Sequence, residues 1–238
     1  MCGRYQLRQL ERWKEIARFR LGRAIEVAVP DGFGERYNIA PQQDVPVLLD
    51  NRLQVLRWGL VPAWSRDPEH NGFINARAET VAEKASFRDA FKHGRCLVPA
   101  DGFYEWQATG GSVKQPYKIE LTSGEPFAFA GIAEKNGTFA ILTSETNALT
   151  AQLHHRMAVM LSPEHWDEWL DPQTPPERLH ALMRPYAADD MRAVPVSTLV
   201  NKPGNEGPEV GEPIGPPLGE GPPPKPPTPP GGQIGLFD

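Results

Sequence analysis

The spacing of apolar and polar residues predicts several helices in this chain. In LRQLERWKEIARF (residues 7–19) apolar side chains recur at helical spacing, which predicts an amphipathic helix. SPEHWDEWL (162–170) opens with Ser-Pro and PPERLHALM (175–183) opens with Pro-Pro, and proline at the first turn is a helix-start signal. We therefore expect three helices, one near the N-terminus and two after the middle of the chain.

Other segments have the pattern of strands. They are short, rich in β-branched or aromatic residues and separated by Gly, Asn and Ser, which favours antiparallel strands. These segments are residues 53–59, 95–100, 116–121, 127–132, 138–144 and 157–161. Strands in series with helices between them predict an α+β fold: a single domain with a curved, barrel-like, mainly antiparallel sheet flanked by helices.

The pattern stops near residue 211. The stretch EPIGPPLGEGPPPKPPTPP is dominated by Pro and Gly and has no apolar periodicity, so it lacks the surface that a core would bury. We expect a folded domain over 2–211, a disordered, Pro/Gly-rich and semi-rigid linker over 212–232, and a short terminal peptide over 233–238.

Composition narrows the class of protein. The chain has no apolar run of membrane-spanning length and no secretory leader pattern, so we expect a soluble cytoplasmic, nucleoid-associated monomer with no membrane contact. The two cysteines, Cys2 and Cys96, exclude a disulfide scaffold, and no Cys or His spacing suits a metal or another cofactor. Most of the net charge of −5 falls in residues 206–238, so a local basic groove for a phosphate backbone is still compatible with the total.

The first residues carry unusual chemistry. Removal of Met1, expected because residue two is small, leaves Cys2 with a free amine beside its thiol. The amine titrates near about 7.7 to 8 and the thiol near about 8.5, so both are usable nucleophiles at neutral pH. An aldehyde can form an imine with the amine and be captured by the sulfur as a five-membered thiazolidine.

Imine chemistry needs proton transfer, and three segments offer groups for it. Asn75 and Arg77 share one face of GFINARAET if it is extended. Glu105 lies among aromatic residues in VPADGFYEW, where burial raises a carboxyl pKa. His154 precedes an apolar strand in HHRMAVML. Each also has a structural interpretation: Asn75 as a turn cap, Glu105 as a paired acid and His154 as a structural hydrogen-bonding group.

Seven motifs occur in an order that resembles the SOS-response-associated peptidase family, over residues 2 to about 201. They are MCGRY, RYNIAPQQ, RWGLVPAW, NARAET, FRDAFKHGRCLVPADGFYEW, HHRM and VPVSTLVN. The resemblance implies a protein that crosslinks to abasic sites in single-stranded DNA through a thiazolidine, with no cofactor. One departure is Ala158, where the family pattern has proline after Arg-Met.

The resemblance also implies roles for individual residues. Cys2 matches the nucleophile, and Asn75 matches the residue that positions the terminal amine and the sugar. Glu105 matches the proton-transfer group for imine formation and ring closure. His154, chosen over its neighbour by the spacing His-x-Arg-Met, is expected to assist sugar-ring opening or the reverse reaction. β-Elimination by a lyase route and a peptidase activity that processes Met1 or the crosslink remain open.

Other motif residues are candidates for DNA contacts. Arginines suit sequence-independent phosphate contacts, and tryptophan faces suit unstacked bases. The candidates are Arg4, Arg77, Arg156, Trp58, Trp64 and Trp106. Cys96, in RCLVPA, is expected to be a core thiol.

The chain ends in GGQIGLFD. Gln233, Leu236 and Phe237 give a Q-x-x-L-F pattern that resembles the peptide by which bacterial replication proteins bind the sliding clamp. Two other functions remain compatible with the sequence. One is a cysteine hydrolase that pairs Cys2 with His154, and the other is a non-catalytic single-strand binder attached to the clamp.

Overall fold

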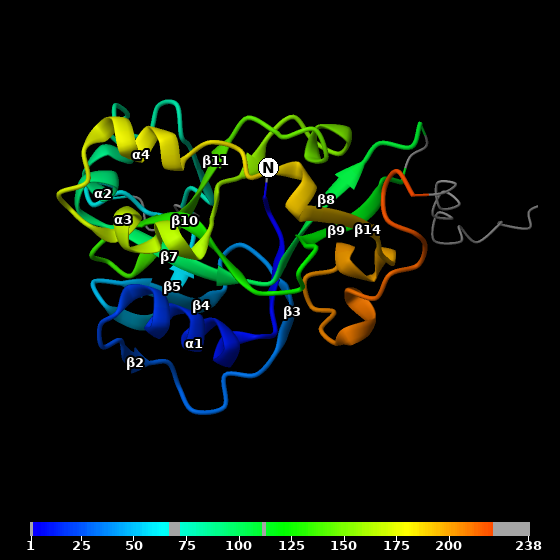
Figure 1. Ribbon diagram of the computed structural model, residues 1–238, viewed down its shortest axis with the longest axis horizontal. Coiled ribbons are helices and arrows are strands. Elements are labelled where there is room, and N and C mark those ends of the chain that lie inside the picture. The colour runs from blue at the N-terminus through cyan, green and yellow to red at the C-terminus, as the bar shows by residue number, and fades with distance from the viewer. Residues whose placement is uncertain (1, 67–71, 111–112, 221–238) are drawn as a thin grey trace, which may run out of the picture.

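The computed structural model describes residues 2–66, 72–110 and 113–220. Its strands form two sheets, which Figure 1 shows side by side, with most of the helices around the left-hand sheet. The α+β prediction of a curved, barrel-like and mainly antiparallel sheet flanked by helices is confirmed. The expected peptide 233–238 and most of the expected linker lie outside the described residues.

The larger sheet closes on itself as a barrel. Its strands are β2 (Glu26–Ala28), β4 (Asp44–Leu49), β5 (Arg52–Trp58), β6 (Asn75–Arg77), β7 (Arg95–Ala100), β10 (Phe127–Ala133), β11 (Thr138–Ser144), β12 (Met157–Ala158) and β13 (Met160–Leu161). The order β11-β10-β7-β4-β5 runs through antiparallel pairs, and β5 then pairs with β11 in parallel. These five strands therefore form a closed ring.

The smaller sheet is antiparallel throughout. In spatial order its strands are β14 (Met191–Pro195), β9 (Gln115–Leu121), β8 (Gly102–Gln107), β1 (Tyr5–Leu7) and β3 (Arg36–Ile39). Asp101 alone separates β7 of the barrel from β8, and its carboxylate accepts hydrogen bonds from the backbone of Gln9 (2.9 Å) and Nε of Arg8 (3.0 Å). This buried carboxylate ties the corner between the sheets to the start of the chain.

Full burial of the central barrel strands explains why the sequence pattern predicts these strands clearly. Every residue of β7, β10 and β11 is buried, and most of these residues are apolar. The expected strands 95–100 and 138–144 match β7 and β11, and the expected strand 157–161 is divided into β12 and β13. The aromatic rings of Tyr5 and Phe129 meet edge to face with centroids 5.8 Å apart, joining β1 to the barrel core.

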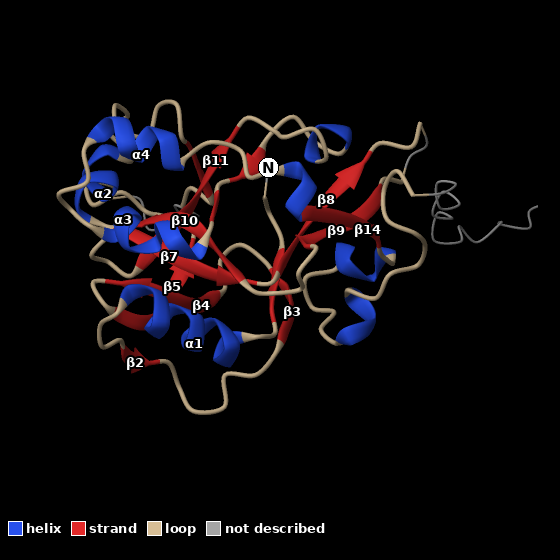
Figure 2. Ribbon diagram, viewed as in Figure 1, coloured by secondary structure: helices blue, strands red, loops and turns tan. Residues whose placement is uncertain are grey.

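Helices cover the outside of the barrel (Figure 2). They are α1 (Leu10–Leu21), α2 (Arg88–His93), α3 (Trp166–Leu170) and α4 (Pro176–Leu182). The described chain also has 3-10 turns η1 (Thr150–Gln152), η2 (Pro163–His165), η3 (Ala188–Asp190), η4 (Thr198–Asn201) and η5 (Pro208–Val210), of which η3, η4 and η5 contact strands of the smaller sheet. In α1 the indole of Trp13 is buried and stacks on Trp166 with centroids 5.1 Å apart. Gly22 ends the helix at φ 59°, a conformation that glycine adopts at little cost.

The three predicted helices form, although 162–170 divides into η2 and α3. The ordered chain also continues past residue 211, because the backbone amides of Ile214 and Leu218 donate to β14 carbonyl oxygens of Pro195 (2.9 Å) and Ala193 (2.7 Å). Within the described ranges, no helix combines the length and the apolarity that crossing a lipid bilayer requires.

Candidate functional site

Cys2 lies between the two sheets, three residues before the first residue of β1. It is fully buried, and the backbone of Arg4 continues the pairing with β8 by accepting a hydrogen bond from the amide of Tyr104 (3.0 Å). Tyr5 stands opposite Phe103, so the same register brings Gly3 opposite Glu105. The start of the chain therefore runs along the strand that carries the candidate proton-transfer residue.

Asn75 contacts the same segment from the barrel. It is the first residue of β6, which pairs in parallel with β11, and its Nδ2 donates to the carbonyl oxygen of Cys2 at 2.9 Å. Its Oδ1 is buried and has no hydrogen-bond partner among the described residues. Asn75 thus holds the backbone of Cys2 with one end of its amide and leaves an acceptor beside it.

Burial shifts the pKa values of two neighbouring groups, the carboxyl of Glu105 and the thiol of Cys2. Glu105 on β8 is only 3% exposed, and burial raises the pKa of its carboxyl. Burial also raises the pKa of the Cys2 thiol, and the negative charge of Glu105 adds to that shift. The thiol therefore favours its neutral form, and it lies beside a carboxyl that holds its proton to higher pH than an exposed glutamate does.

His154 follows η1 and precedes β12. Its Nδ1 lies 3.0 Å from the backbone nitrogen of Arg156 and 3.2 Å from that residue's carbonyl oxygen. The amide N–H of Arg156 can therefore donate to Nδ1 of the neutral ring, and the carbonyl oxygen of Arg156 can accept from Nδ1 of the charged ring. Burial lowers the pKa of His154, and its ring stacks on His155 with centroids 4.2 Å apart.

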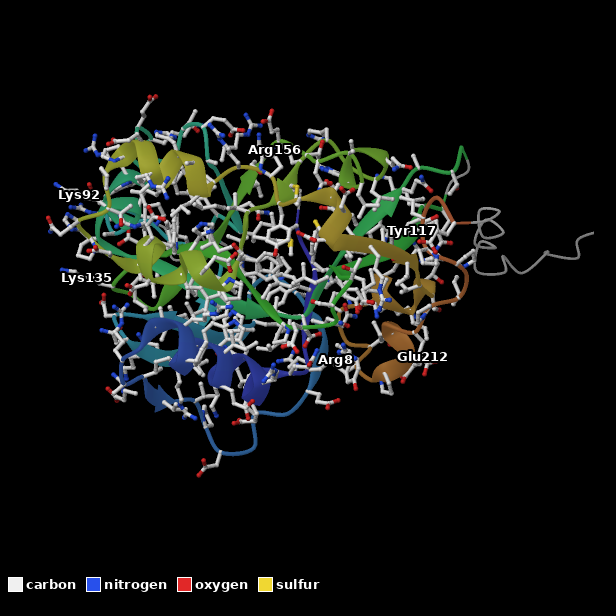
Figure 3. The ribbon with its side chains drawn as sticks, viewed as in Figure 1. Arg8, Lys92, Tyr117, Lys135, Arg156 and Glu212 are labelled. Carbon is white, nitrogen blue, oxygen red and sulfur yellow. The ribbon has the colours of Figure 1, made fainter. Side chains whose placement is uncertain are left out.

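Arg156 connects this loop to the barrel strands. Its guanidinium donates to both carboxylate oxygens of Glu79, at 2.6 and 2.9 Å, and to the carbonyl oxygen of Thr143 on β11. Figure 3 shows Arg156 at the upper edge of the molecule. Arg77 lies on β6 opposite Thr143 and is exposed. Of these two arginines, Arg77 is the more open to a phosphate in the free protein.

Two of the predicted DNA-contact residues have structural roles. Arg4 is half-buried and its Nη1 donates to Oδ1 of Asn38 (2.8 Å) and to the carbonyl oxygen of Val200 (2.6 Å), so it anchors the N-terminal segment to η4. The prediction that Trp58 offers a face to bases is wrong. Its side chain is fully buried, with Nε1 donating to the carbonyl oxygen of Ile74 at 2.8 Å.

The other two tryptophans differ in exposure. Trp64 is 62% exposed, whereas Trp106 on β8 is half-buried and donates from Nε1 to Oδ1 of Asn201 at 2.7 Å. Stacking of bases on Trp64 or Trp106 stays a prediction. Cys96 is fully buried on β7, as expected for a core thiol, and burial raises its pKa.

Two charged residues near the site were not selected from the sequence. Glu79 belongs to the NARAET motif at the i+4 position from Asn75, so an extended-strand pattern could have placed it on the same side. Lys114, exposed at the start of β9, has no such signal. Burial is the main cause of both pKa shifts: it raises the pKa of Glu105 and lowers that of His154. The charge of Lys114 opposes the shift of Glu105 and adds to that of His154.

Residues 2–66, 72–110 and 113–220 hold no group of three or more His, Cys, Asp or Glu side chains arranged to bind an ion. Both cysteines are free thiols.

Comparison with known proteins gives relatives along nearly the whole chain. The abasic site processing protein YoqW of Bacillus subtilis is 43% identical, covering 88% of this chain and 98% of the relative. The abasic site processing protein YedK of Escherichia coli is 31% identical, covering 90% of this chain and 100% of the relative.

A solved structure gives the same result for the fold. A crystal structure of a protein from Bacteroides thetaiotaomicron superposes with a TM-score of 0.74 at 28% identity, covering 89% of this chain and 99% of the other. The family model described as SOS response associated peptidase (SRAP) matches residues 1–203. The resemblance drawn from the sequence motifs is thus confirmed, and this chain belongs to the SOS response associated peptidase family.

Proposed function

We propose that this protein processes abasic sites in single-stranded DNA by forming a covalent crosslink through Cys2. The observation that carries the proposal is the environment of Cys2: its backbone is held by Asn75 at 2.9 Å, and its thiol lies within the electrostatic influence of the buried carboxyl of Glu105. The abasic site processing relatives from Bacillus subtilis and Escherichia coli support this substrate class.

The proposed reaction is a condensation that releases one water. After Met1 is removed, the amine of Cys2 adds to the aldehyde carbon of the ring-opened abasic sugar. Loss of water from the carbinolamine gives an imine. The thiol sulfur then adds to the imine carbon while the thiol proton passes to the nitrogen, which closes the thiazolidine. No electron donor or acceptor is needed.

The site residues have separate tasks in this scheme. Glu105, whose pKa burial raises, supplies a proton to the departing hydroxyl and accepts one from the thiol. Asn75 positions the amine through the Cys2 carbonyl and offers Oδ1 to the sugar. His154 moves a proton during sugar-ring opening or during reversal. Exposed Arg77 contacts a neighbouring phosphate.

The proposal is tested with an abasic single-stranded oligonucleotide. Wild-type protein, with its N-terminus verified by mass spectrometry, is expected to give a DNA-protein adduct that survives a denaturing gel. The Cys2→Ala variant and a variant that retains Met1 are expected to give none. A wild-type protein that leaves the abasic strand unmodified would contradict the proposal, as would an adduct formed equally by Cys2→Ala.

A cysteine hydrolase fits the site less well. Such an enzyme needs a thiolate paired with histidine, but burial raises the pKa of the Cys2 thiol and lowers that of His154, so both groups favour their neutral forms. This alternative predicts no adduct with the abasic strand, and it predicts turnover of a peptide substrate in a separate assay.

We further propose that the terminal peptide binds the sliding clamp. The sequence Q-x-x-L-F supports this, because one polar hook and two apolar anchors suit a preformed groove, and a tether raises the effective concentration. Replacing Gln233, Leu236 and Phe237 with alanine is expected to abolish capture of the protein by purified clamp, while leaving crosslinking intact. Equal capture of the triple variant and the wild type would contradict the idea.

A further inference from the structure

Glu79 makes a two-point side-chain contact near the site that the proposed reaction does not use. Its two carboxylate oxygens accept from Nη1 and Nη2 of Arg156 at 2.6 and 2.9 Å, a bidentate pair that fixes the guanidinium plane. The Glu79 side chain is 51% exposed, and an ion pair of that exposure contributes little to stability. Its effect is therefore expected on orientation rather than on folding.

The backbone of Arg156 contacts His154, so the placement of Arg156 affects the orientation of the His154 ring. Its backbone nitrogen lies 3.0 Å from Nδ1 of His154, so the position of the Arg156 peptide determines the direction of the imidazole ring. Its Nη2 also donates to the carbonyl oxygen of Thr143, which lies opposite Arg77 in the β6–β11 ladder. The Arg156 side chain thus fixes the loop that holds His154 to the barrel, beside the pairing of β12 with β11 that follows it.

The segment that binds the Arg156 side chain, residues 75–79, also contacts Cys2. Glu79 lies just beyond β6, and Asn75 at the start of β6 donates to the Cys2 carbonyl oxygen at 2.9 Å. A single stretch of five residues, 75–79, therefore contacts the nucleophile at one end and the histidine loop at the other. The relative placement of Cys2 and His154 depends on this stretch.

We propose that Glu79 is a positioning residue that aligns His154 with Cys2 by holding Arg156. Glu79 touches no reacting atom, and the inference rests on the crosslinking function proposed above. It also assigns Arg156 a different main task from the phosphate contact expected from the sequence. Its charge is already engaged by Glu79, so removal of Glu79 frees Arg156 toward DNA while it misaligns His154.

The test is a double-mutant cycle on crosslink formation and reversal, measured under single turnover with saturating abasic single-stranded DNA. Glu79→Ala is expected to change the same rate that His154→Ala changes, in the same direction and by about tenfold or more, since small misplacements of a reacting group are costly. In the His154→Ala background, Glu79→Ala is expected to cause no further change. The affinity for intact single-stranded DNA is expected to stay equal or rise.

Two other variants guard the interpretation. Glu79→Gln keeps a hydrogen-bonding group for Arg156 and is expected to fall between wild type and Glu79→Ala. Glu83→Ala removes an exposed glutamate four residues further on and is expected to match wild type. Thermal melts establish that each variant is folded.

Three outcomes would overturn the inference. Rates of Glu79→Ala and Glu79→Gln equal to wild type, or effects of Glu79→Ala that add fully to those of His154→Ala, would remove the positioning role alone. In both cases the wild-type adduct still forms, so the proposed function stands. Absence of any wild-type adduct would remove both.

Discussion

Two buried polar regions of this molecule differ in how completely their hydrogen bonds are made. Arg95 on β7 is 8% exposed, and its guanidinium donates to the carbonyl oxygens of Phe91 (3.0 Å), Trp169 (2.8 Å) and Asp171 (2.7 Å). Beside Cys2, by contrast, Oδ1 of Asn75 is buried without a partner in the described chain. All three donors of the first region are satisfied, whereas the second region retains a buried acceptor without a partner among the described residues.

The two regions also differ in how burial affects the charge of their central residues, Arg95 and Glu105. Burial lowers the pKa of Arg95, but a guanidinium titrates so high that it stays charged and serves as a permanent connection between β7 and α3. Burial raises the pKa of Glu105 from a starting value near about 4.3, which brings its titration toward neutral pH. A permanent charge stabilises a fold, and a carboxyl that can change its protonation can take part in a reaction.

The largest difference should appear when each region loses its charge. Replacing Glu105 with glutamine keeps the size of the side chain and removes the proton-transfer group. We expect the rate of crosslink formation to fall by about 10² to 10⁴-fold, the range for a general acid or base, with the folded state retained. Single-turnover gels against an abasic strand measure the rate, and circular dichroism measures folding.

The matched control for this prediction is Glu120→Gln. Glu120 on β9 is also buried, but it forms ion pairs with Lys118 (3.0 Å) and Arg192 (2.7 Å), so we expect it to stabilise the fold and take no part in the reaction. Crosslinking by folded Glu120→Gln should be close to wild type. If both variants crosslink at the wild-type rate, Glu105 is not a proton-transfer group.

Arg95→Leu should have the opposite profile. The substitution leaves three carbonyl oxygens of Phe91, Trp169 and Asp171 without their donor in a buried setting. We expect the free energy of unfolding to fall by roughly 2–4 kcal/mol, because unmade buried hydrogen bonds carry the desolvation penalty of each group. Denaturant titration measures this change. An unchanged midpoint, or a crosslinking rate lost while the protein remains folded, would contradict the structural role.

Much of the barrel follows from the sequence because its strands are buried on both faces. Segments rich in apolar and β-branched residues such as 95–100 and 138–144 favour buried strands, and they form β7 and β11. Strands β1 and β6 are only three residues long, and their pairing partners are distant in the chain. Such short strands arise from tertiary pairing, which local periodicity does not record.

The candidate site was less uniformly predictable. Motif order located Cys2, Asn75, Glu105 and His154, but exposure depends on which face of a strand meets the barrel. Trp58 lies in an apolar strand and occupies the core, so its aromatic character gave no information about access. The link from Glu79 to Arg156 joins residues that are 77 positions apart, and only the folded chain shows it.

The smallest expected effect concerns the pH dependence of stability. Below about pH 4.3, Glu105 is protonated in both the folded and the unfolded chain, so wild type and Glu105→Gln respond alike to pH. Above that pH the unfolded chain releases the proton while the native state, whose Glu105 pKa is raised by burial, retains it. The native state then binds more protons, and wild-type stability falls relative to Glu105→Gln until the pH passes the folded pKa.

Urea denaturation of both proteins from pH 4 to pH 8 measures this difference. The free energy of unfolding of Glu105→Gln minus that of wild type should rise with pH and then level off, so the less active variant becomes the more stable one. Arg95→Leu minus wild type should stay flat over the same range, because Arg95 is charged throughout. A flat profile for Glu105→Gln would mean that Glu105 titrates as an ordinary carboxyl, and the contrast between the two regions would then rest on hydrogen bonding alone.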